Sequence, residues 1–195
     1  MQWLPKIWRV ALLTCIATVV RAADQPPARN VYSGQGLELH AQTRTPDQMV
    51  AFYTGRGFPS AMLEPISHVC FLTVSMRHTR RDVVWLEPSR WRILDGAGNA
   101  VNRLDRDFWN RVWDTMQAPP ASRATFGWTQ LPESRDLQPG EPVGGNITIV
   151  APSGAFSLEV RFSTGRDKMG PDIVGRIDGL VCQGQSAGKA KAGGS

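Results

Sequence analysis

Strict alternation of apolar and polar residues near the C-terminal end of the chain constrains its fold more than any other feature. The apolar positions are Phe156, Leu158, Val160 and Phe162, with polar or charged residues between them. A period of two places every apolar side chain on one face, as in a β-strand with one buried and one solvated face. The sequence of residues 143–150 predicts a second strand. The turn residues Pro152, Ser153 and Gly154 indicate that this strand and the one at 156–162 form a hairpin. The stretch therefore predicts an antiparallel β-sandwich.

Similar patterns earlier in the chain predict further strands and short helices. Strands are expected over 37–42, 67–78, 83–86, 90–94 and 123–130, with a last strand over 173–182. Thr45, Pro46 and Gln48 are typical of a helix start with a capping box. Residues 104–116 carry apolar side chains at helical spacing and stop before Pro119 and Pro120. We expect a mainly β fold with one or two inserted short helices.

The turn before residue 143 carries a resemblance to a known family. The residues concerned are Leu137, Pro139, Gly140, Glu141, Val143 and Gly145. This turn and the strands after it resemble the late hairpin of bacterial telokin-like immunoglobulin-fold domains, and residues 70–98 resemble an earlier part of the same domain. The resemblance implies an immunoglobulin-like β-sandwich in a secreted or lipid-anchored module. It implies no functional residue, because the shared residues form turns.

The first 22 residues have the composition of a secretory signal peptide. Lys6 and Arg9 precede the apolar run 10–20, and residues 20–22 fit a cleavage site. The run is shorter than the roughly 20 residues of a membrane span. We therefore predict a periplasmic or secreted bacterial protein without a transmembrane segment after cleavage. The remaining chain is expected to comprise a flexible lead-in (23–34), the sandwich (35–183) and a disordered tail (184–195).

Charge and cysteine content narrow the function further. The net charge of +5 comes from the ends of the chain, since residues 30–185 contain 16 basic and 16 acidic side chains. This balance argues against a nucleic-acid partner. Removal of the leader removes Cys15 and leaves Cys70 and Cys182, an even pair that predicts a disulfide in an exported protein. Two separate buried thiols are the alternative.

The chain contains none of the common catalytic motifs, so we predict no enzymatic activity and no obligatory cofactor. Copper binding is the alternative chemistry, because Met76 and His78 share one face of a predicted strand and could be joined by His40. His68 lies about 33 Å from His78 on an extended strand and is too distant. A core methionine beside an exposed histidine at the strand end is the simpler interpretation.

The predicted helix over 104–116 carries Phe108, Trp109 and Trp113 on its apolar stripe. These rings belong either to the protein core or to an exposed aromatic patch that binds a partner. We take the three residues as the candidate partner surface. The predicted function is an exported, non-enzymatic module that recognises a periplasmic or envelope protein. The alternatives are a copper-binding periplasmic protein and a carrier of a small apolar ligand in a pocket beneath the same helix.

Overall fold

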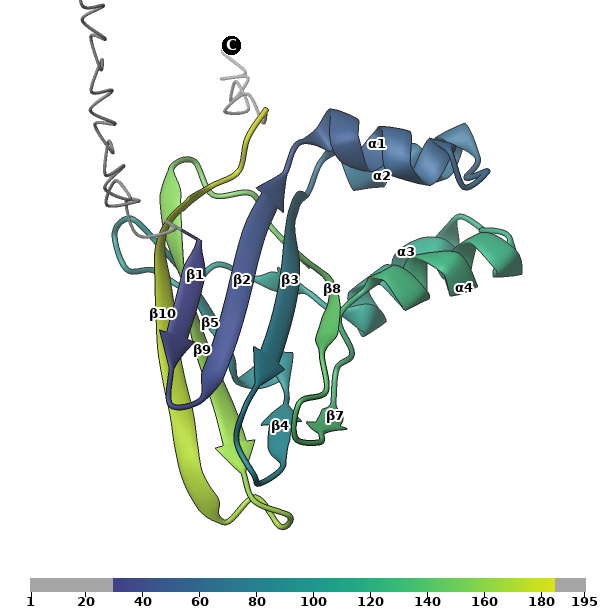
Figure 1. The fold of residues 1–195 in the computed structure, drawn as a ribbon. Coiled ribbons are helices and arrows are strands. Elements are labelled where there is room, and N and C mark those ends of the chain that lie inside the picture. The colour runs from purple at the N-terminus through teal and green to yellow at the C-terminus, as the bar shows by residue number, and fades with distance from the viewer. Residues whose placement is uncertain (1–29, 185–195) are drawn as a thin grey trace, which may run out of the picture.

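The computed structural model describes residues 30–184, which form two antiparallel β-sheets packed face to face (Figure 1). Sheet A has the strand order β1-β2-β3-β8-β6, and its strands are β1 (Val31–Gly34), β2 (Leu37–Arg44), β3 (Cys70–His78), β8 (Val143–Ile149) and β6 (Arg103–Leu104). Sheet B has the order β10-β9-β4-β7, with β5 paired to β9. Its strands are β10 (Gly170–Val181), β9 (Ala155–Thr164), β4 (Val84–Leu86), β7 (Arg135–Leu137) and β5 (Arg92–Asp95). The mainly β sandwich predicted from the alternation is confirmed.

The predicted disulfide joins the two sheets. Cys70 begins β3 in sheet A, and Cys182 directly follows β10 in sheet B. The two residues are bonded, with their Cα atoms 5.7 Å apart. Cys70 is part of the apolar core between the sheets, to which the inward-facing residues of β2, β3, β9 and β10 contribute. The bond therefore connects an early and a late strand through the core.

The hairpin predicted over 143–162 is wrong, although both of its strands exist. β8 pairs with β3 and β6 in sheet A, whereas β9 pairs with β10, β4 and β5 in sheet B. The turn at 152–154 therefore carries the chain from one sheet to the other. Alternation reports which face of a strand is buried, and two strands that face each other across a core satisfy it as well as two paired strands.

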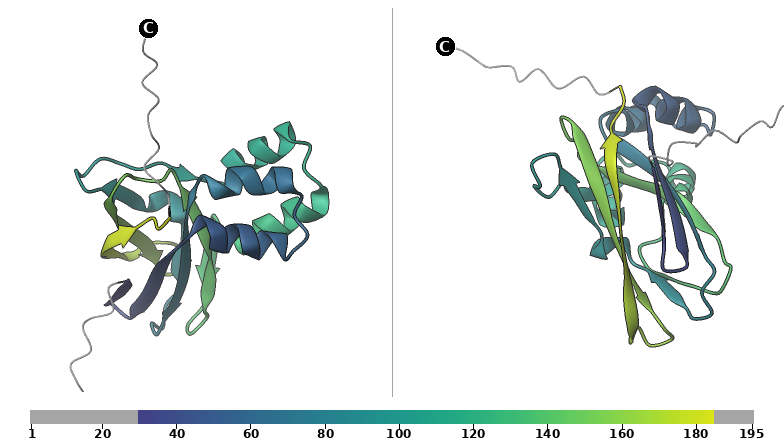
Figure 2. Two further views of the ribbon diagram at one scale, coloured as in Figure 1. Left: turned by 90° about the horizontal axis from the view of Figure 1, so that it is seen from above. Right: turned by 60° about the vertical axis from the view of Figure 1, so that its left-hand side comes forward.

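Helices form the second part of the molecule. They are α1 (Pro46–Thr54), α2 (Ser60–Ser67), α3 (Arg106–Thr115) and α4 (Pro120–Thr129), and a short 3-10 helix, η1 (Pro88–Arg90), links β4 to β5. Figure 1 shows α1 with α2 and α3 with α4 projecting from one end of sheet A, and the view from above in Figure 2 shows the two pairs side by side. The predicted capping box at Thr45 and Gln48 is present.

Two helix predictions require correction. The described residues contain four α-helices instead of one or two, since α2 and α4 were not expected. Residues 123–130, predicted as a strand, lie almost entirely in α4. Ala124, Phe126 and Trp128 alternate in sequence, but only Phe126 is buried, whereas Trp128 is exposed. Pro120 occupies the first turn of α4, a position that suits proline because the first amides of a helix have no acceptor within the helix and proline has no N–H group.

A second apolar core lies between the helices and the outer face of sheet A, near the end of the sheet where β3 begins. Its buried members are Met49, Tyr53, Phe58, Met62, Ile66, Phe71, Trp109, Trp113, Ala118 and Phe126. Phe71 is on β3 and points outward, because its neighbours Cys70 and Leu72 belong to the core between the sheets. The helices thus cover part of the outer face of sheet A with an aromatic cluster.

The N-terminal boundary of the sandwich differs from the predicted one. Val31–Gly34 was predicted as part of a flexible lead-in but forms β1, whose four residues pair with β2. The predicted signal peptide (1–22) and nearly all of the predicted tail, from residue 185 onward, lie outside the described residues. None of the helices within 30–184 is long and apolar enough to cross a membrane.

Candidate functional site

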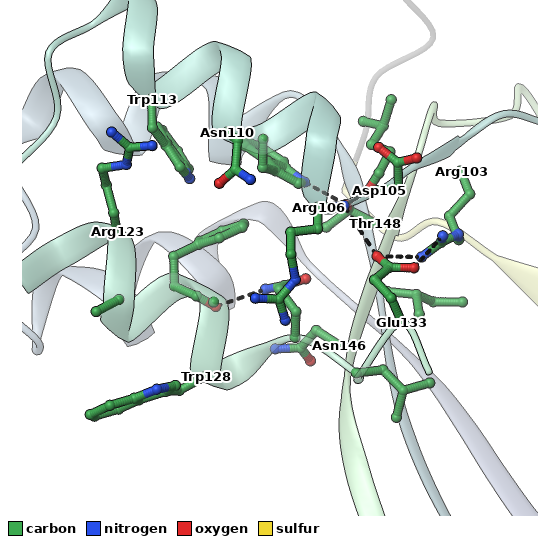
Figure 3. Close-up of a pocket in the computed structure, with 18 residues that line it drawn as sticks. Arg103, Asp105, Arg106, Asn110, Trp113, Arg123, Trp128, Glu133, Asn146 and Thr148 are labelled. Carbon is green, nitrogen blue, oxygen red and sulfur yellow. Dashed lines mark hydrogen bonds and ion pairs between the residues drawn. The ribbon is translucent and has the colours of Figure 1, made fainter. Parts of the chain in front are cut away.

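A pocket between α3, α4 and the edge of sheet A is the best candidate for a functional site (Figure 3). It has a volume of about 160 Å³. Its apolar lining includes Trp109, Trp113, Phe126, Leu131 and Ile147, and its polar lining includes Arg103, Asp105, Arg106, Asn110, Arg123, Gln130, Glu133, Asn146 and Thr148. We call it the α3–α4 pocket.

The start of α3 is held in place by two carboxylates. Asp105 is the N-cap residue, and its side chain accepts a hydrogen bond of 2.9 Å from the backbone amide of Phe108. Glu133, on the segment after α4, accepts two hydrogen bonds from the Arg103 guanidinium, at 3.0 and 2.6 Å. It also accepts a hydrogen bond of 3.1 Å from the backbone amide of Arg106. The two carboxylates therefore serve the backbone of α3 and a neighbouring arginine at the pocket rim.

Stacked indole rings form the apolar wall. Trp109 and Trp113 are one helical turn apart on α3, and their rings stack at 4.9 Å between centroids. Phe126 of α4 contacts both rings, at 4.8 and 5.1 Å. Trp109 Nε1 donates a hydrogen bond of 2.7 Å to Thr148 Oγ1, whereas the buried Nε1 of Trp113 has no partner among residues 30–184.

Arg106 supplies the positive charge of the pocket. Arg103 is paired with Glu133, and Arg123 is paired with Asp114 at 2.7 Å. The Arg106 guanidinium forms no ion pair with any residue in the range 30–184, and Figure 3 shows it extending from the start of α3 into the pocket toward Asn146. A cation that faces an aromatic wall without a protein counter-ion suits an anionic group on a flat ligand.

Gly145 determines how closely the segment after α4 can approach β8. Leu131 donates its backbone amide to the carbonyl of Asn146 at 2.8 Å, so this segment lies against the edge of β8. A Cβ atom on Gly145 would lie 2.5 Å from the backbone nitrogen of Leu131, a contact that real Cβ atoms do not make. Glycine at this position therefore allows the segment after α4 to lie against β8.

Tyr53 anchors α1 to the end of α4. Its hydroxyl is 2.7 Å from Thr129 Oγ1 and accepts a hydrogen bond of 3.3 Å from the Gln130 side-chain amide. The ring is fully buried in the helical core. Burial raises the pKa of Tyr53 to about 12, because the phenolate would lose its hydration. The neutral phenol thus fixes the relative position of the two helix pairs.

A larger groove lies beside this pocket, between α1 and α4 on the outer face of sheet A. It has a volume of about 650 Å³ and is lined by Arg44, Gln48, Met49, Phe52, Thr73, Trp128, Thr129, Gly144, Gly145 and Asn146. We call it the α1–α4 groove. Trp128 and Asn146 line both the groove and the α3–α4 pocket. Trp128 is 86% exposed, which is unusual for so large an apolar ring.

The predicted partner surface is wrong for its two tryptophans. Trp109 and Trp113 are only 3% and 1% exposed, and Phe108 is half-buried against the same cluster. The helical stripe is present, but the element that covers it, α4, was not expected. A pocket does lie next to this helix, between α3 and α4.

The three candidate metal ligands are not brought together. Met76 and His78 point into the core between the sheets, and the His78 ring nitrogen Nε2 is 3.2 Å from the carbonyl of Leu137. His40 points to the opposite, outer face and is 2.7 Å from Glu38. His78, expected to be exposed, is fully buried because the turn before β8 covers the strand end. In the range 30–184, no three His, Cys, Asp or Glu side chains form a metal-binding group.

Comparison with protein families and with curated proteins gives no match. Two solved structures from Bacillus subtilis are similar to this chain. The yjhA protein has 9% sequence identity and a TM-score of 0.37, over 66% of this chain and 75% of its own. The candidate lipoprotein ycdA of strain 168 has 14% identity and a TM-score of 0.43, over 77% of this chain and 38% of its own. Neither description names a ligand or a reaction.

Proposed function

We propose that the protein is an exported, non-enzymatic β-sandwich module of immunoglobulin-like type, which binds a small planar anion in the α3–α4 pocket. The single observation that carries this proposal is the position of Arg106, which faces the aromatic wall without a counter-ion in the described chain. The aromatic wall favours a flat apolar body, and the guanidinium favours a carboxylate.

The size of the pocket limits the ligand. Its volume of about 160 Å³ is close to that of the ~150 Å³ engineered cavity that accepts benzene. It is smaller than the roughly 300 Å³ at which pockets for drug-sized molecules begin. A single aromatic ring with one carboxylate, such as benzoate, fits these limits.

A binding role without catalysis is supported by the structural hydrogen bonds that the two carboxylates at the pocket rim accept. Asp105 caps α3, and Glu133 is bonded to Arg103 and to the backbone of Arg106. General acid–base catalysis needs a carboxyl group that is free to exchange protons with a substrate. These two are occupied by structural hydrogen bonds, which favours a binding role for the pocket.

Export is supported by the disulfide and by the leader-like composition of residues 1–22. Structural disulfides persist in the bacterial periplasm and outside the cell, and they are rare in the reducing cytosol. The immunoglobulin-like type is supported by the resemblance around Pro139 and Gly140 and by the two packed antiparallel sheets. We place the protein in the periplasm or outside the cell.

Titration with benzoate and with its uncharged analogue benzamide tests the proposal. Binding to the mature protein would be followed by tryptophan fluorescence and by the shift of the thermal unfolding midpoint. We expect saturable benzoate binding, and about tenfold weaker binding after Arg106→Gln, because a charge-assisted hydrogen bond contributes about 1.5–3 kcal/mol. Benzamide should bind more weakly than benzoate to the wild type and equally well to both proteins.

Two further variants separate binding from folding. Gly127→Leu places a side chain in the pocket at a helical glycine whose added Cβ would meet only the Arg106 guanidinium, at 3.9 Å. It should abolish benzoate binding while leaving α4 intact, because leucine favours helix more than glycine does. Arg111→Gln removes an exposed charge from the same helix as Arg106, outside the pocket, and should bind benzoate like the wild type. Equal benzoate affinity in Arg106→Gln and Arg111→Gln would refute the proposal.

A further inference from the structure

The α1–α4 groove contains an arginine, Arg44, whose side chain is oriented by a hydrogen bond to the neighbouring strand β3. Arg44, the last residue of β2, donates a hydrogen bond of 2.9 Å from Nε to Thr73 Oγ1. Thr73 Oγ1 in turn donates to Asn146 Oδ1, also at 2.9 Å. The two terminal amino groups of Arg44 form no hydrogen bond or ion pair with residues 30–184. A guanidinium held in this way presents its free side to the groove, in the geometry that binds a carboxylate through two hydrogen bonds.

Where β8 borders the groove, its backbone is bridged to Gln130 at Asn146 but has no strand partner on that side at Gly144 among residues 30–184. The carbonyl of Asn146 accepts from Leu131, so the backbone groups of Asn146 point away from β3. Backbone groups of an antiparallel strand alternate in direction, and those of Gly144, two residues earlier, therefore also point away from β3. Within the described chain no strand pairs with β8 at Gly144 on that side. An extended peptide can bind such an edge through its own amide and carbonyl groups.

Two aromatic side chains from different helices line the same groove. Phe52 comes from α1, and Trp128 comes from α4. The Phe52 ring is covered on one face by the Arg56 guanidinium, 3.4 Å from its centroid, which holds the ring in place. Trp128 is almost fully exposed, so a bound apolar side chain would remove a large area from water.

The spacing of these features fits a short extended chain. Thr73, which holds Arg44, pairs with Asn146, and Gly144 lies two residues further along β8. With ~3.3 Å per residue along a strand and ~4.8 Å between strands, Thr73, which binds the Arg44 side chain, and Gly144 are about 8 Å apart. Two to three peptide residues span this distance. A fatty acid could satisfy Arg44 and the aromatic rings, but it offers no amide or carbonyl group to Gly144.

We propose that the α1–α4 groove binds the C-terminal end of an extended peptide. The terminal carboxylate pairs with Arg44, the peptide backbone bonds to the edge of β8 at Gly144, and an apolar side chain near the C-terminus packs between Phe52 and Trp128. The partner is therefore a protein with a free, apolar C-terminus that reaches the same compartment. This site shares Trp128 and Asn146 with the α3–α4 pocket but uses a different arginine, so neither proposal depends on the other.

Fluorescence anisotropy with labelled pentapeptides that end in leucine or phenylalanine tests this site. Each peptide would be used as the free acid and as the C-terminal amide, with the label at the N-terminus. We expect saturable binding of the free acids, and at least about tenfold weaker binding of the amides, since amidation removes the charge. Arg44→Gln should reduce the affinity for the free acids to that for the amides.

Three variants show whether the peptide occupies this groove. Trp128→Ala should weaken the binding of every peptide. Because the Trp128 side chain is exposed, this substitution should leave the fold intact. Arg77→Gln removes an exposed arginine from the same face of sheet A, near its other end, and should leave the affinity unchanged. Arg106→Gln, which tests the other pocket, should also leave it unchanged.

Several outcomes would overturn the proposal. These are no saturable binding of any free acid at millimolar concentration, equal affinity for acid and amide, or an affinity that survives Arg44→Gln. Palmitate would be added as a competitor to test the alternative occupant. Displacement of the peptide by palmitate, with palmitate bound more tightly than any of the peptides, would assign the groove to a lipid and also refute the peptide site.

Discussion

At the scale of single residues, the helical part of the molecule depends on polar atoms buried among aromatic rings. The hydroxyl of Tyr53 is the clearest case, since it links α1 to Thr129 and Gln130 at the end of α4. Burial disfavours the charged phenolate and raises the pKa of Tyr53 to about 12, although the hydrogen bonds with Thr129 and Gln130 act in the opposite direction. The folded state therefore binds the phenolic proton more tightly than the unfolded chain does.

This difference predicts a loss of stability at alkaline pH. Above pH 10.0, the ordinary pKa of tyrosine, the unfolded chain releases the proton, whereas the folded chain keeps it until about pH 12. Stability from this group is complete below 10.0 and should fall by up to about 3 kcal/mol as the pH rises to 12. In the variant Tyr32→Phe, Tyr53 is the only tyrosine, and its ionisation can be followed by phenolate absorbance. Ionisation of the folded variant near 10.0 would contradict the prediction.

At the scale of elements, α3 shows how one helix can carry two similar tryptophans with different energetic roles. Both rings are buried, and both contact Phe126. Trp109 donates its indole N–H to Thr148 on β8, and so attaches the helix to sheet A. The buried N–H of Trp113 has no partner within residues 30–184. A buried N–H without an acceptor costs free energy, whereas a bonded one contributes to stability.

Replacement of each tryptophan by phenylalanine separates these roles. The two changes remove the same atoms from the same cluster, so the difference between them reports the hydrogen bond. We expect Trp109→Phe to lower the free energy of unfolding by at least about 1 kcal/mol more than Trp113→Phe does. Urea-induced unfolding measures both values. An equal loss in the two variants would mean that the N–H of Trp113 is bonded to water or to a ligand.

At the scale of the whole molecule, the disulfide joins the two sheets across a long loop. Cys70 and Cys182 are separated by 112 positions in sequence, so the bond greatly reduces the number of conformations open to the unfolded chain. It also fixes the start of β3 beside the end of β10. The bond therefore ties sheet B to sheet A, whose strands line the pocket and the groove.

Removal of this bond should destabilise the protein strongly. For a loop of this length the chain-entropy relation gives about 4–5 kcal/mol. We expect Cys70→Ala/Cys182→Ala to lower the free energy of unfolding by about this amount, with native circular dichroism retained at low temperature. Unfolding in urea, compared with the oxidised wild type, measures the loss. A decrease of less than about 1 kcal/mol would show that the sheets hold together without the bond.

The sequence by itself determined the local features of this protein. The alternation in 156–162 specified a strand with one buried face, the pattern at Thr45 specified a helix start, and the even cysteine pair specified the disulfide. Each of these follows from backbone sterics, from capping over a few residues or from the tendency of two cysteines to form a disulfide. Such signals act over short distances in the sequence or involve only one possible pair of cysteines, so they can be recognised without a structure.

Only the tertiary structure decided which surfaces meet. It placed β8 and β9 in different sheets, converted the predicted strand at 123–130 into α4, and buried Trp109 and Trp113 beneath it. It also set Arg106 and Arg44 in two neighbouring hollows, which no local pattern predicted. The physical reason is that a periodic pattern identifies the apolar face of an element but not the element that covers it. That choice depends on packing between segments far apart in the chain, and the candidate sites are built from those same contacts.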